Sequence, residues 1–152
     1  MIDTKVSFGL DFLSIMANVH MRSGKKGNMN GFLLARLFLT TEWGLTAEEG
    51  DEANQLFWQG VNKETLEDLG SVAERFIAHL KKDAMASSKF ITQMMTINYL
   101  DAQITDEEKE FTMLFATELD FRKSEIDVMA SKAVNCAISY DFFANNFVKD
   151  TS

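Results

Sequence analysis

The chain has 152 residues and contains no proline. Proline lacks a backbone N–H and breaks helix interiors, whereas sandwiches and barrels usually carry it in turns and edge strands. Its absence therefore favours long helices over sheets. Apolar residues recur at steps of three and four almost throughout, with no strand-like alternation. The sequence predicts an all-α protein, a single-domain bundle of about seven to eight helices.

The apolar pattern also predicts where the helices lie. We expect an N-terminal helix within residues 1–20, then a flexible loop over residues 21–31 that holds three glycines and three basic residues. Further helices are expected at residues 32–41, 46–59, 66–80, 90–100 and 105–119, and from residue 120 or 124 to about 140. A polar break over residues 81–88 is expected to separate two of them.

Two acidic segments, residues 42–49 and 101–108, share one pattern at an offset of 59 residues. The pattern is an acid, two residues, an aliphatic residue, Thr, any residue and two Glu. Each copy follows a nearly all-apolar stretch and precedes an amphipathic one. An internal repeat predicts one supersecondary unit used twice. We therefore expect two pseudo-repeated halves, about residues 29–82 and 88–148, within one domain spanning residues 1–152.

One interpretation of the repeated segment is a capping box, which needs no ligand. Thr46 and Thr105 would be the N-cap residues, and their side chains would accept from the backbone N–H of Glu49 and Glu108. Those two glutamates would in turn accept from the N–H of the cap residue. Acids in the first turn also suit the positive end of the helix dipole.

A second interpretation begins with the acids that capping does not use. Glu42 and Asp101 end the preceding helices, where the dipole disfavours negative charge, and Glu48 and Glu107 are not needed for the box. Grouped carboxylates with loop carbonyls would suit Ca²⁺, Mg²⁺ or Mn²⁺. The candidate metal ligands are Glu42, Glu48, Glu49, Asp101, Glu107 and Glu108. The same acids could instead form a docking surface for a basic protein partner.

The net charge of −8 is concentrated in these segments. Residues 42–52 carry −5 and residues 101–110 carry −4, so the rest of the chain is nearly neutral. An acidic protein lacks the basic face that neutralises phosphates, which argues against binding to nucleic acid.

The repeated motif resembles that of the TerB-like domains of tellurite-resistance proteins, in which acid-Gly-x-aliphatic-Ser/Thr-x-x-Glu follows an apolar helix twice. The match is best over residues 92–121, weaker over 33–57, and with the helical pattern covers about 29–143. Trp43 and Ala102 replace the family's glycine, and Glu42 stands where Asp is usual. The resemblance implies an internally pseudo-symmetric helical fold and a cytoplasmic stress-response module without catalytic activity. It also implies that the acids of both loops are the functional surface, through divalent cations or directly.

The alternative function is binding of a small molecule or an anion, or an enzyme built on such a site. Arg22, Lys25 and Lys26 lie in a glycine-rich stretch, residues 22–31, before a helix, and helix N-termini bind anions. Nine methionines and thirteen phenylalanines could also line a pocket between helices. The sequence contains no Gly-x-Ser-x-Gly, no Walker-type loop and no Gly-x-Gly-x-x-Gly.

Other chemically distinctive residues suggest structural roles. His20 and His79 lie in no metal-binding pattern, and we expect the single cysteine, Cys136, to be a small buried apolar group. Trp43 and Trp58 flank an acidic stretch and predict either a partner contact or a place in the core. The sequence shows neither a signal peptide nor an apolar run of about 20 residues, so we expect a cytoplasmic protein. Monomer and homodimer both remain open.

Overall fold

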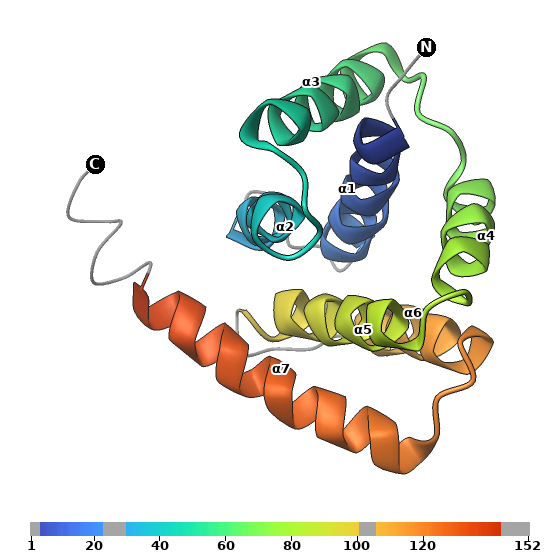
Figure 1. Ribbon diagram of the computed structural model, residues 1–152, viewed down its shortest axis with the longest axis vertical. Coiled ribbons are helices and arrows are strands. Elements are labelled where there is room, and N and C mark those ends of the chain that lie inside the picture. The colour runs from blue at the N-terminus through green and yellow to red at the C-terminus, as the bar shows by residue number, and fades with distance from the viewer. Residues whose placement is uncertain (1–3, 23–29, 101–105, 144–152) are drawn as a thin grey trace. The chain divides into compact units, whose positions relative to one another are not determined.

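The computed structural model describes residues 4–22, 30–100 and 106–143, which form seven α-helices without any strand in these ranges (Figure 1). The prediction of an all-α protein is confirmed for this part of the chain. The helices are α1 (Thr4–Arg22), α2 (Asn30–Thr41), α3 (Ala47–Lys63), α4 (Leu69–Leu80), α5 (Ala84–Tyr99), α6 (Asp106–Glu118) and α7 (Lys123–Phe143). The chain divides into two compact units, Met1–His79 and Leu80–Ser152.

In the first unit, α1 packs against both α2 and α3. The approach of α1 to α3 depends on a glycine, because a Cβ atom on Gly9 would lie 2.9 Å from the Cβ of Ala53. Helix α1 turns a fully buried face to this core, and α2 buries most of its length. The largest fully buried side chains of this unit are Phe12, Leu13, Ile15, Met16, Leu39 and Phe76.

Aromatic clusters hold the remaining parts of the first unit. The ring of Phe8 on α1 lies 5.0 Å from the rings of both Trp43 and Phe76, so the cluster joins α4 to α1. The ring centroids of Trp58 and Phe32 lie 5.2 Å apart. Both tryptophans are half-buried in ring clusters, at the edge of the core.

The second unit is built on α5, which packs against α6 and α7. Phe90 of α5 and Phe115 of α6 are fully buried, with ring centroids 5.4 Å apart. Helix α7 turns a small-residue stripe inward, including Ala133 and Ala137. The expectation for Cys136 was wrong, because this cysteine is exposed. It directly precedes Ala137, so its side chain leaves the helix about 100° away from the buried stripe.

Helix boundaries differ from the prediction where a capping residue starts or stops a helix. Helix α4 begins at Leu69 and not at residue 66, because the Asp68 carboxylate accepts from the backbone N–H of Ser71. Leu66 lies instead in the connection and packs on Gly60, where a Cβ atom would come within 2.4 Å of Leu66 Cδ2. Helix α3 runs past residue 59 to Lys63.

The two stretches expected to be unstructured are partly helical. Asp83 caps α5 through the backbone N–H of Met85 and Ala86, so the predicted break over residues 81–88 shrinks to residues 81–83. Four residues of the predicted loop over residues 21–31 belong to α1 and α2 instead. Residues 23–29 lie outside the described ranges.

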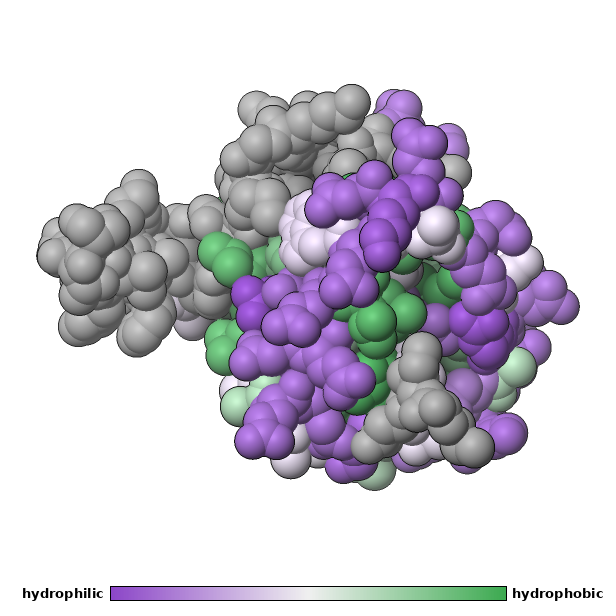
Figure 2. All heavy atoms as spheres, turned by 90° about the horizontal axis from the view of Figure 1, so that it is seen from above, coloured by the Kyte–Doolittle hydropathy of each residue, from purple (hydrophilic) through white to green (hydrophobic). Residues whose placement is uncertain are grey.

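Hydrophilic residues dominate the face shown in Figure 2, and hydrophobic residues reach the surface in patches between them. None of the helices in the described ranges has the length and apolar character needed to cross a membrane.

Candidate functional site

The first acidic segment forms the predicted capping box. The Thr46 hydroxyl accepts from the backbone N–H of Glu49 at 3.1 Å, and the Glu49 carboxylate accepts from the N–H of Thr46 at 2.9 Å. Glu42 and Glu48 are exposed. The Glu49 carboxylate is therefore engaged in capping the start of α3.

The second acidic segment is described only from Asp106 onward, so Asp101 and Thr105 lie outside the described residues. Glu107 is exposed in the first turn of α6, whereas Glu108 is only 1% exposed. Across the described ranges, no three His, Cys, Asp or Glu side chains form a group that could hold a metal ion. The described candidate ligands therefore form no such group.

The predicted anion site falls mostly outside the described part of the chain. Arg22 is the last residue of α1, and Lys25 and Lys26 are not described. His79, in the last turn of α4, is exposed and lies 5.8 Å from the ring of Phe8.

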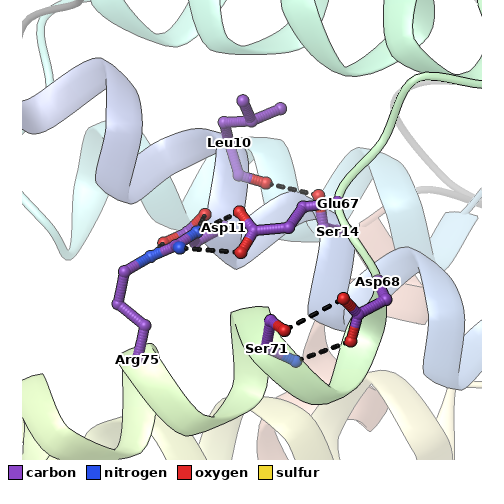
Figure 3. A network of polar contacts seen from close by, with 7 residues as sticks. All are labelled: Leu10, Asp11, Ser14, Glu67, Asp68, Ser71 and Arg75. Carbon is purple, nitrogen blue, oxygen red and sulfur yellow. Dashed lines mark hydrogen bonds and ion pairs between the residues drawn. The ribbon is translucent and has the colours of Figure 1, made fainter.

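A charged cluster in the first unit joins α4 to α1 and to the connection between α3 and α4 (Figure 3). Arg75 donates to both carboxylate oxygens of Asp11, at 3.0 and 2.8 Å, and to both oxygens of Glu67, each at 3.0 Å. Hydrogen bonds to Asp11 and then to Glu67 raise the pKa of the Arg75 guanidinium above its ordinary value. Arg75 therefore pairs with both carboxylates inside the cluster. The cluster acts as a clamp that holds α4 to α1 and to the connection before α4.

Two clefts flank this clamp. One, of about 330 Å³, is lined by residues that include Ser14, Phe57 and Leu66, and the other, of about 310 Å³, includes Asp11 and Arg75. Their central polar groups already have partners, since the Ser14 hydroxyl donates to the Leu10 carbonyl and Arg75 pairs with its two carboxylates. These clefts have room for a ligand, but their best-placed polar groups are engaged.

The second unit contains a cleft of about 280 Å³ among α5, α6 and α7. Three residues from each neighbouring helix line it, at helical spacing: Met95, Asn98 and Tyr99 from α5, Lys109, Thr112 and Met113 from α6, and Ile126, Asp127 and Ala130 from α7. This volume would hold about nine water molecules at about 30 Å³ each, which is enough for a small organic ligand.

A half-paired buried amide distinguishes this cleft. Asn98 is 3% exposed, and its Nδ2 donates to Thr112 Oγ1 at 2.9 Å. Its Oδ1 is buried and has no hydrogen-bond partner among the described residues. Turning the amide by 180° would exchange the two atoms and leave Nδ2 unpaired instead. In either orientation, one polar end of Asn98 is buried without a partner, on a residue that lines the cleft.

The rest of the lining is apolar inside and charged at the surface. Met95 is 7% exposed and Ala130 is half-buried, whereas Lys109 and Asp127 are exposed. Sequence reasoning missed this arrangement of residues. The available signal was Asn98 itself, a polar residue in the stretch 90–100, where seven of the eleven residues are apolar.

Comparison with known proteins finds no match to any family model, curated protein or solved structure. The TerB-like resemblance stays a prediction made from the sequence. The geometry of the described residues is therefore the basis for proposing a function.

Proposed function

We propose that the second unit binds a small molecule in the cleft among α5, α6 and α7. The observation that carries this proposal is the half-paired amide of Asn98, which is 3% exposed and lines the cleft. Leaving a buried polar group unpaired costs about 1–3 kcal/mol. A ligand that pairs with the amide would recover part of that cost, so ligand binding explains why a polar side chain occupies this position.

The composition of the cleft supports the same function. Ligand sites in proteins are concave, mostly apolar and equipped with a few polar groups that fix orientation. Here methionine, isoleucine and alanine side chains provide the apolar wall, and Asn98 and Thr112 provide a polar point within it. The two clefts beside Arg75 lack this combination, because Ser14 and Arg75 are already paired.

The proposal is tested by ligand titration with NMR detection, using four probes of similar size: indole, benzofuran, benzoate and benzylamine. Ala130→Phe would fill the cleft, and Ser131→Phe, on the next residue of α7 and exposed, is the matched control. We expect at least one probe to bind wild type and the Ser131→Phe variant but not the Ala130→Phe variant. Binding of none, or equal binding by both variants, would refute the proposal.

A second candidate function concerns the two acidic segments. We propose that they form a non-catalytic TerB-like surface that docks a basic protein partner or holds a divalent cation. Its support is the exposure of Glu42, Glu48 and Glu107, together with the concentration of negative charge in both segments. The pseudo-repeat of the two helical halves belongs to the same proposal.

Cation binding and docking of a basic partner can be tested separately. Millimolar Ca²⁺, Mg²⁺ or Mn²⁺ should raise the melting temperature by mass action if a cation binds, and Asp101→Asn with Glu108→Gln should remove the gain. An equal gain in the double variant would exclude cation binding at these acids. Capture of a basic peptide that depends on Glu42 and Glu48 without added metal would support docking.

A further inference from the structure

We infer that the cleft of the second unit selects an uncharged aromatic ligand that donates a hydrogen bond, from an N–H or O–H group, to Oδ1 of Asn98. This inference rests on the proposed function, because it names the chemical class that the same cleft would take.

The hydrogen-bonding requirement follows from the pairing of Asn98. In the amide orientation of the structure, Nδ2 donates to Thr112 Oγ1 at 2.9 Å, so the polar atom left over is the acceptor Oδ1. An acceptor needs a donor on the ligand. A site built around one buried hydrogen bond discriminates strongly against analogues that lack the matching group, because binding them leaves the buried atom unpaired.

The preference for an uncharged ligand follows from the position of the charges. The interior of the cleft offers Met95, Asn98 and Thr112, all buried and none of them ionisable. Lys109 and Asp127 are the two charged residues of its lining, and both are exposed. Their opposite signs cancel, so the cleft does not favour a cation or an anion. A charge carried inside would lose its hydration without gaining a partner.

The preference for an aromatic ring comes from the two methionines. Met95 on α5 and Met113 on α6 both line the cleft. Thioether sulfur makes favourable contacts with aromatic rings, and methionine side chains adapt their shape to a flat ligand. A ring that carries an N–H or O–H group could contact both methionines while donating to Asn98.

The test compares indole with benzofuran, which has the same shape but replaces the N–H donor by an oxygen. We expect indole to bind wild type about tenfold more tightly, the effect of one hydrogen bond to a buried acceptor. Benzoate and benzylamine should bind more weakly than indole. Asn98→Leu should remove the preference for indole over benzofuran, and Thr112→Ser, which retains the hydroxyl, should preserve it.

Several outcomes would overturn the inference. Equal affinity for indole and benzofuran, tighter binding of benzofuran, or a preference that survives in Asn98→Leu would each exclude donation to Asn98 Oδ1. If benzoate or benzylamine binds best and Ala130→Phe abolishes that binding, the cleft is a ligand site but the inferred ligand class is wrong. If Asn98→Leu does not fold, the shift of the wild-type Asn98 side-chain amide signals decides, since indole should perturb them far more than benzofuran does.

Discussion

The buried pair of Asn98 and Thr112 gives the sharpest prediction about stability. Thr112 is 4% exposed and supplies the described hydrogen-bond partner of the Asn98 amide. Thr112→Val keeps the side-chain shape but leaves both ends of that buried amide unpaired. We expect the free energy of unfolding to fall by about 1–3 kcal/mol, the cost of an unsatisfied buried polar group.

The double variant Asn98→Leu with Thr112→Val should behave in the opposite way. Replacing both partners of a buried hydrogen bond by apolar groups is close to neutral or stabilising, and here it also removes the unpaired Oδ1. The added volume of leucine has room, because Asn98 lines a cleft. We expect the double variant to be at least as stable as wild type, although it can no longer pair with a ligand donor.

Urea denaturation followed by far-UV circular dichroism measures the effect. Both tryptophans, Trp43 and Trp58, lie in the first unit, so their fluorescence reports on that unit alone, whereas dichroism follows the helices of both units; a change seen by dichroism but not by fluorescence is assigned to the second unit. Thr117→Val is the matched control, since Thr117 is exposed on the same helix, and its effect should stay within about 0.5 kcal/mol. A double variant as unstable as the sum of the two single variants would refute the reasoning.

Three further predictions concern the first unit, and each is measured by urea denaturation. Thr46→Ala removes the N-cap of α3 and should cost about 1 kcal/mol, whereas Thr46→Ser should cost much less. Gly9→Ala places a methyl group 2.9 Å from the Cβ of Ala53 and should destabilise the unit by about 1–3 kcal/mol; a gain in stability would show that α1 and α3 can separate. Hydrogen bonds from Ser71 hold the pKa of Asp68 below its ordinary value of 3.8, so the ionised cap stabilises above that pH and the gain is lost as the pH falls through the folded-state pKa. Asp68→Ala should therefore differ from wild type at neutral pH and converge with it in strong acid, and a constant difference would contradict this.

The helices were predictable because their signals are local. The spacing of apolar side chains decides which face of a helix can be buried, and it identified seven helices within the described ranges. The capping box at Thr46 and Glu49 was predictable for the same reason, because its partners lie three residues apart. Helix ends were less predictable: Asp68 and Asp83 each start a helix at a position that apolar spacing alone did not show.

The cleft could not be predicted, because it depends on residues that packing brings together. Asn98 and Thr112 are separated by the connection between two helices, and only the packing of α5 against α6 brings the amide to the hydroxyl. The exposure of Cys136 was hidden for a related reason. A sequence shows which residues are apolar, but the rotation of α7 against α5 decides which of them face inward.

The sequence by itself determined the helical class of the protein, the approximate extent of its helices and the cap at the start of α3. These depend on side-chain spacing and on hydrogen bonds between near neighbours. Only the tertiary structure decided that Arg75 clamps α4 to α1, and that one end of Asn98 remains unpaired in a cleft. Pairing and burial are properties of surfaces in contact, and a buried amide is recognised as half-satisfied only when every neighbour is in place.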